Sequence, residues 1–175
     1  EEAIKEEHEF MQELNREGIP AVAPLILNND STTIVQNDMI YTCFPKAIGR
    51  MPQELSLKDY KSLGQQLAKL HNVGAQKKAK HRLTLDVETY GWKALDILEK
   101  WVAPEVWSRY EESACQILEF LEERLDPQSY IRIHGDCHKG NILQTDPLQG
   151  QKQFFFVDFD DFINGLPVQD FWMLF

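Results

Sequence analysis

Apolar residues recur at helical spacing in three stretches of this 175-residue chain. The first covers residues 1–18, where glutamates separate the apolar positions and Gly18 supplies a stop; the apolar face consists of Ile4, Phe10, Met11 and Leu14. The second begins after a serine N-cap, Ser56, and runs to about His71. The third begins at Pro104 and ends before the Asp126-Pro127 pair. The pattern predicts three amphipathic helices, with a polar connection over residues 76–82.

Short apolar segments bounded by turn residues predict antiparallel strands in two parts of the chain. The N-terminal set is separated by Asn28-Asn29-Asp30 and Gln36-Asn37-Asp38 and comprises residues 22–27, 32–35 and 39–44. The second set has a turn region at Gly150 and comprises residues 130–133, 141–144 and 154–159. Helices and antiparallel strands together predict an α+β fold.

Two prolines and a glycine make residues 45–52 the best candidate for a linker between substructures. We therefore expect a first domain over residues 1–44, a linker or hinge over 45–52, and a second domain over 53–175.

The chain has 18 Lys and Arg against 28 Asp and Glu residues, a formal net charge of −10. Such a charge repels phosphate backbones and anionic lipids, so we expect neither nucleic-acid nor membrane partners. Three scattered cysteines indicate no disulfide framework or zinc module and fit a reducing cytoplasm. No apolar run approaches the roughly 20 residues that span a bilayer, and the acidic start is unlike a secretory signal. We expect a cytoplasmic protein.

Reactive side chains are densest in His134-Gly135-Asp136-Cys137-His138-Lys139-Gly140-Asn141, between two predicted strands. A further predicted strand leads into Val157-Asp158-Phe159-Asp160-Asp161. Phosphoryl transfer from a nucleotide needs a carboxylate to accept the proton of the attacking hydroxyl, and oxygen ligands for Mg²⁺. Asp136 would supply the base, and Asn141 and Asp158 the ligands. Each residue alone is more typical of an ordinary turn, but the set in this order favours a phosphotransferase site.

This pattern resembles the aminoglycoside phosphotransferase and choline-kinase-like family, which is related to the eukaryotic protein kinases. The resemblance rests on the 134–141 segment and on Val157-Asp158-Phe159, which stands where the kinases have Asp-Phe-Gly. Two other segments, residues 63–71 and 165–170, are similar to the family as a whole. Residues 137–143 and 169–174 look most like one branch of it, the stress response kinase A branch of cytoplasmic Ser/Thr protein kinases. The resemblance implies a protein-kinase-like two-lobe fold, incomplete at both ends. Its N-lobe part would hold helix C and antiparallel strands, and its C-lobe part would be mostly helical.

Carried over position by position, the resemblance makes Asp136 the catalytic base and Asn141 and Asp158 the Mg²⁺ ligands. It assigns the remaining positions to ATP: Glu7 pairs with a nucleotide-binding lysine, Pro45, Lys46 and Ala47 form a hinge that offers backbone groups to adenine, and His138 lies near the transferred phosphate. His134 is interpreted as a structural residue that bonds the loop backbone, and Asp170 as a brace within the core.

The family also has a hairpin over the phosphates and a strand lysine before helix C, and helices after the metal-binding strand; this chain contains neither set. We therefore expect part of a longer protein, or a fragment without turnover. Loss of the lysine and lid costs on the order of 100-fold or more in rate, which predicts negligible activity for these 175 residues alone. Two alternatives to a Ser/Thr protein kinase stay open. One is a small-molecule kinase for an amino alcohol, aminoglycoside or homoserine hydroxyl, and the other is an inactive module that binds a partner.

Overall fold

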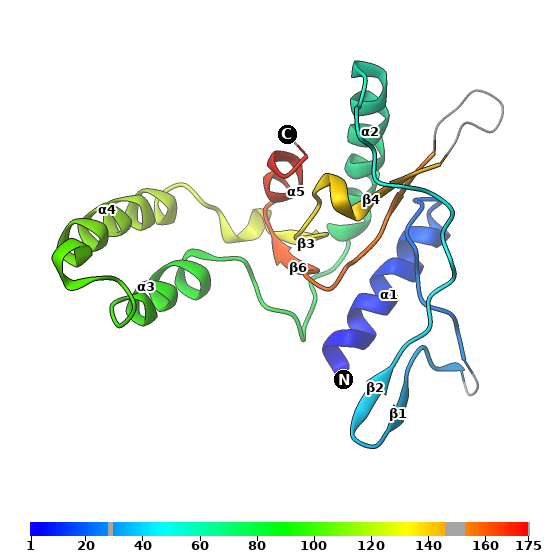
Figure 1. The fold of residues 1–175 in the computed structure, drawn as a ribbon, viewed down its shortest axis with the longest axis horizontal. Coiled ribbons are helices and arrows are strands. Elements are labelled where there is room, and N and C mark those ends of the chain that lie inside the picture. The colour runs from blue at the N-terminus through cyan, green and yellow to red at the C-terminus, as the bar shows by residue number, and fades with distance from the viewer. Residues whose placement is uncertain (28–29, 146–152, 175) are drawn as a thin grey trace. The chain divides into compact units, whose positions relative to one another are not determined.

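The computed structural model describes residues 1–27, 30–145 and 153–174 (Figure 1). The chain divides into two compact units, Glu1–Leu83 with Ile131–Phe175, and Thr84–Tyr130. The first unit contains α1 (Glu2–Arg16), β1 (Ile34–Gln36), β2 (Met39–Tyr41), α2 (Leu57–Gly74), β3 (Ile131–Ile133), the 3-10 helix η4 (Lys139–Asn141), β4 (Ile142–Gln144), β5 (Phe154–Phe156), β6 (Ile163–Gly165) and α5 (Val168–Trp172). The second contains the π-helix η2 (Glu88–Trp92), α3 (Lys93–Leu98), α4 (Pro104–Glu122) and the 3-10 helix η3 (Pro127–Ser129).

Helix α1 confirms the first predicted helix and buries three of the four expected apolar side chains: Phe10, Met11 and Leu14 are at most 1% exposed, whereas Ile4 is only partly buried. The helix ends as the sequence indicates. Gly18 has a φ of +73°, and its N–H donates to the carbonyl of Asn15 over 3.0 Å. A positive φ favours glycine over any residue with a side chain, so Gly18 fixes the exit of the chain from α1.

Helix α2 begins with the predicted cap. The hydroxyl of Ser56 accepts from the Asp59 N–H, and the Asp59 carboxylate accepts from the Ser56 N–H over 2.9 Å, which forms a capping box. Along α2, Leu63, Leu67 and Leu70 are buried on one face, which packs against α1 and β3. The helix therefore joins α1 to the strand that precedes the reactive loop.

The third predicted helix is also confirmed, since α4 begins at Pro104. Its predicted apolar face is not a buried core: no residue of α4 is buried, and Ile117 is 60% exposed.

Three two-stranded antiparallel sheets form in the described part of the chain: β1 with β2, β3 with β6, and β4 with β5. The β1–β2 hairpin turns at the predicted site (Figure 1). Asn37 and Asp38 have φ values of 52° and 59°, the left-handed pair that a two-residue type I′ turn requires. Of the other predicted turns, Asn28, Asn29 and Gly150 lie outside the described residues.

One strand prediction is wrong. Residues 22–27 form no strand of a ladder; instead single bonds hold the segment, from the Val22 N–H to the Phe156 carbonyl and from the Leu25 N–H to the Cys43 carbonyl. The strand predicted over 154–159 is shorter, since β5 ends at Phe156. The sequence patterns also missed α3, β6 and α5.

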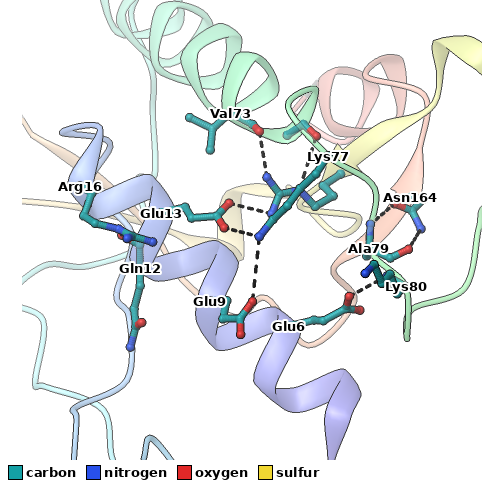
Figure 2. A network of polar contacts seen from close by, with 12 residues as sticks. Glu6, Glu9, Gln12, Glu13, Arg16, Val73, Lys77, Ala79, Lys80 and Asn164 are labelled. Atoms are coloured by element: carbon teal, nitrogen blue, oxygen red, sulfur yellow. Dashed lines mark hydrogen bonds and ion pairs between the residues drawn. The ribbon is translucent and has the colours of Figure 1, made fainter. Parts of the chain in front are cut away.

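A buried arginine ties the elements of the first unit together. Arg132 on β3 is 2% exposed; its guanidinium lies 2.8 Å from the Glu13 carboxylate of α1 and donates to the Val73 carbonyl of α2 over 2.9 Å. Figure 2 shows Lys77 approaching the same carboxylate, at 2.6 Å. Burial alone would raise the pKa of Glu13, but the bonds from Lys77 and Arg132 hold it below its usual value. A search of the described helices finds no stretch long and apolar enough to cross a membrane.

Candidate active site

The reactive loop, residues 134–141, connects β3 to β4 and begins with a close backbone approach. Gly135 has a φ of +88°, and a Cβ at this position would lie 2.1 Å from the carbonyl oxygen of Asp161. Only glycine fits here without displacing one of the two backbone segments, that of Gly135 or that of Asp161. The segment after β5 therefore lies directly against the reactive loop.

Within the loop, the predicted base and one predicted ligand are joined. The Asn141 side-chain amide donates to both the carbonyl and the carboxylate of Asp136, over 2.9 and 3.1 Å. The nitrogen of the amide is thus committed to Asp136, which leaves its Oδ1 as the atom that can bind a cation. Asp136 keeps 31% of its side chain exposed, so its carboxylate is open to solvent.

His138 caps the short helix η4 inside this loop. Its Nδ1 accepts from the Asn141 N–H over 3.2 Å, so Nδ1 carries no proton and Nε2 does. Nε2 faces Asp136 at 3.6 Å, and the side chain is 47% exposed. The ring therefore orients the loop and still presents an edge to solvent beside the predicted base.

Asp158 follows β5 in a strained conformation, with a φ of 62°. The preceding residue, Val157, is bonded to the reactive loop on both sides: its N–H donates to the Asn141 carbonyl and its carbonyl accepts from His134, each over 3.0 Å. Left-handed backbone in a residue other than glycine persists where the surrounding structure fixes it. These two bonds set the position of Asp158 relative to Asn141.

Asp170 on α5 braces the start of the loop, as interpreted from the sequence. Its buried carboxylate accepts from the backbone N–H groups of His134 and Gly135, over 3.0 and 2.9 Å, and from Nε2 of His71 over 2.8 Å. His134 is fully buried, and this burial lowers its pKa. It is therefore neutral, with its single proton on the Nε2 that donates to Val157, which is a structural role. Cys137 is also buried, which raises the pKa of its thiol and removes it as a nucleophile.

A pocket of about 270 Å³ adjoins Asp158. Three acidic residues and five apolar ones line it: Glu7, Asp158, Asp160, Met11, Val22, Phe44, Val157 and Phe159. The structure thus brings Glu7 and Asp158 together, although 151 positions separate them in the sequence. None of the predicted hinge residues, Pro45, Lys46 and Ala47, is among the residues that line this pocket; Phe44, which directly precedes them, is.

Glu7 has an ion-pair partner that the sequence reading missed. Its carboxylate lies 2.9 Å from Nη2 of Arg82, and both side chains are largely buried. Burial raises the pKa of Glu7 to about 7, in opposition to Arg82, and the nearby carboxylates of Asp160 and Asp158 add to the rise. No local signal marks Arg82, since it stands at the end of a polar connection that reads as an ordinary loop.

The oxygen donors present fit Mg²⁺ held jointly with a nucleotide. Among the described residues, no group of three or more His, Cys, Asp or Glu side chains could hold a metal ion alone. Mg²⁺ commonly binds one or two protein oxygens and completes its shell with phosphates and water. Oδ1 of Asn141 and the carboxylate of Asp158 match that requirement.

Sequence comparisons relate this chain to known proteins. The model of the phosphotransferase enzyme family matches residues 1–175. Stress response kinase A of Salmonella choleraesuis (strain SC-B67) is 31% identical over 98% of the chain, and that of Escherichia coli (strain K12) is 28% identical over 98%. The protein named Serine/threonine protein kinase RdoA of Salmonella typhimurium is also 31% identical, over 98% of the chain. The chain spans about half the length of these curated relatives, 51% of each.

Solved structures show the same fold. Amicoumacin kinase hAmiN, in complex with AMP-PNP, Ca²⁺ and Ami, superposes with a TM-score of 0.74 at 20% identity, over 99% of this chain and 52% of that one. A microcompartment-associated aminopropanol kinase gives 0.68 at 23% identity, over 97% and 57%. The predicted α+β, protein-kinase-like fold is confirmed. The chain covers only about half of the length of these solved proteins, in agreement with the prediction of an incomplete fold. By the match along its whole length, this chain belongs to the phosphotransferase enzyme family.

Proposed function

We propose that the protein transfers the γ-phosphoryl group of ATP to a hydroxyl group, with Mg²⁺. The observation that carries this proposal is the pair of hydrogen bonds made by the backbone of Val157. They join the segment that contains Asp158 to the loop that contains Asp136 and Asn141. Two carboxylates and an amide oxygen thereby belong to adjoining loops, as phosphoryl transfer requires.

Each side chain in the proposal has one task. Asp136 accepts the proton of the attacking hydroxyl and is oriented for this by the Asn141 amide. Asn141 and Asp158 offer the oxygens for the metal. Bound Mg²⁺ would offset the negative charge of the phosphate oxygens.

The nucleotide is proposed to bind along the pocket beside Asp158. Phe44 and Val22 provide apolar surface there, and Pro45, Lys46 and Ala47 continue the chain from Phe44 with backbone groups for an adenine ring. His138 would lie near the transferred phosphate. Glu7 lines the same pocket and would form an ion pair with a nucleotide-binding lysine.

For the acceptor we propose Ser and Thr hydroxyls of proteins in the cytoplasm. The support is the identity of 27–31% with relatives that are named as stress response kinases or as a Ser/Thr protein kinase. A small-molecule hydroxyl is the second candidate, favoured by the net charge of −10, which suits a cationic amino alcohol or aminoglycoside.

Two substitutions, made in the full-length protein, test the proposed site. Asp136→Asn should lower kcat by about 100-fold or more and leave nucleotide affinity unchanged, because a general base acts in the chemical step. Asp158→Asn should instead weaken binding of the Mg²⁺-nucleotide complex. Asp96→Asn on α3 provides a matched, exposed control. Equal loss of nucleotide binding in both site variants would contradict the assigned roles.

The acceptor is tested with the same protein. ³²P transfer from labelled ATP to a generic Ser/Thr protein substrate is compared with ADP release in the presence of a panel of amino alcohols and aminoglycosides. Transfer to protein supports the first candidate, and ADP release with an amine supports the second. The absence of both, with no Mg²⁺-dependent thermal stabilisation by nucleotide, would identify an inactive module and refute the proposal.

A further inference from the structure

The left-handed conformation of Asp158 needs support on both sides. Before Asp158, the two bonds of Val157 to Asn141 and His134 fix the chain. A residue with a side chain adopts positive φ uncommonly, and such a residue persists where its neighbours hold it. After Asp158, the chain is also bonded to a residue of another part of the sequence.

Arg82 provides that support. Its Nη2 donates to the carbonyl oxygens of the two residues that follow Asp158: Phe159 over 3.3 Å and Asp160 over 2.6 Å. Arg82 comes from the segment after α2, 77 and 78 positions away in the sequence. One guanidinium nitrogen thus holds two successive carbonyls next to Asp158.

Arg82 is itself held in place. The Glu7 carboxylate of α1 lies 2.9 Å from the same Nη2, and the guanidinium carbon lies 5.4 Å from the centre of the Phe162 ring. The side chain of Arg82 is only 18% exposed and that of Glu7 only 8%. A partly buried, charge-assisted contact of this kind is stronger than a surface ion pair.

We propose that Arg82 is a positioning residue for the metal-nucleotide site. It connects Glu7 on α1 to the backbone after Asp158. It thereby keeps the Asp158 carboxylate turned toward the pocket that Glu7 and Asp158 line. Arg82 contacts no reacting atom in this scheme. The proposal rests on the proposed function in one respect, because it takes Asp158 as a ligand of the Mg²⁺-nucleotide complex.

The test compares Arg82→Gln and Arg82→Lys with the parent in the full-length protein, using calorimetric titration of ATP with and without Mg²⁺. We expect Arg82→Gln to raise the Kd for ATP by about 10-fold when Mg²⁺ is present, the size of one lost hydrogen bond to a charged group. The Kd without Mg²⁺ should stay within about twofold. Arg82→Lys keeps the charge beside Glu7 but not the reach to both carbonyls, so its Kd should lie between those of the parent and Arg82→Gln. Arg124→Gln, at an exposed arginine of the other unit, is the matched control.

A Kd unchanged in Mg²⁺ would overturn the proposal, as would an equal rise with and without Mg²⁺, because a general loss of structure affects both. Should Arg82→Gln fail to fold, Arg82→Lys decides, and parental affinity in it overturns the proposal. Hydrogen exchange gives a second readout that needs no ligand. The Phe162 amide, which donates to the Phe159 carbonyl over 2.8 Å, should exchange faster in Arg82→Gln while amides of α2 keep their rates. A parent protein that binds no nucleotide would refute the proposed function, and the exchange result would still decide whether Arg82 holds this segment.

Discussion

The buried carboxylate of Asp170 offers the sharpest test of how the reactive loop is held. We consider Asp170→Asn, which keeps the size of the side chain but replaces one acceptor oxygen by an NH₂ donor. In the parent, the two oxygens accept from His134 N–H, Gly135 N–H and His71 Nε2. All three groups donate, so the new NH₂ must face at least one of them.

The magnitude follows from counting the contacts. A hydrogen bond to a charged acceptor contributes about 1.5–3 kcal/mol, and a buried donor left unpaired costs about 1–3 kcal/mol. Asp170 is 0% exposed, so water cannot replace the lost acceptor. One lost bond and the loss of charge at the others give an expected fall of about 3 kcal/mol in the free energy of unfolding.

Urea unfolding at neutral pH, followed by fluorescence, measures this fall from the midpoint and the slope. Asp126→Asn is the control, because Asp126 caps η3 on the surface and Asn caps a helix equally well. We expect that control to change the free energy of unfolding by less than about 0.5 kcal/mol. A loss below about 1 kcal/mol in Asp170→Asn would refute the view that this carboxylate braces the loop.

Three further predictions concern single residues of the first unit. Gly135→Ala should lower the free energy of unfolding by more than about 2 kcal/mol. The control is Gly64→Ala on α2, where an added Cβ meets no atom within 4 Å and should raise the free energy of unfolding by about 0.5–1 kcal/mol. Similar urea midpoints for the two variants would contradict the close approach at Gly135. Burial lowers the pKa of His134, so the unfolded chain takes up a proton below about pH 6.5 that the folded chain does not. Stability should therefore fall with pH below that value, by up to about 1.4 kcal/mol per pH unit, and an equally steep fall in His134→Gln would assign the effect to another group. Ser56→Ala should lower the free energy of unfolding, measured by thermal unfolding, by about 1 kcal/mol, while Ser56→Thr should keep most of the stability of the parent. Equal losses in the two variants would argue against the capping box.

Local patterns predicted the features that depend on neighbours in the sequence. The spacing of Phe10, Met11 and Leu14, the cap at Ser56 and the Asn37-Asp38 turn each specify an element within a few residues. The reactive loop belongs to this class, because Asp136 and Asn141 lie five positions apart and bond directly. The roles assigned to these two residues stay proposals that the kinetic experiments test.

Features that depend on distant partners were not predictable in this way. Residues 22–27 have strand composition, but single bonds to Phe156 and Cys43 replace a ladder. Arg82 was overlooked because its three acceptors come from α1 and from the segment after β5. The exposed face of α4 shows the converse limit, since helical periodicity predicts an apolar face but not what covers it.

The buried guanidinium of Arg132 has a consequence for regulation. If α1 swung outward, Glu13 would leave, and a cation that is 2% exposed would lose its counter-charge. Breaking a buried ion pair from one side costs about 3–5 kcal/mol, which would hold such a displaced state below about 1% of the population. Any regulatory movement of α1, which would carry Glu7 away from the pocket that it lines, therefore has to overcome this ion pair.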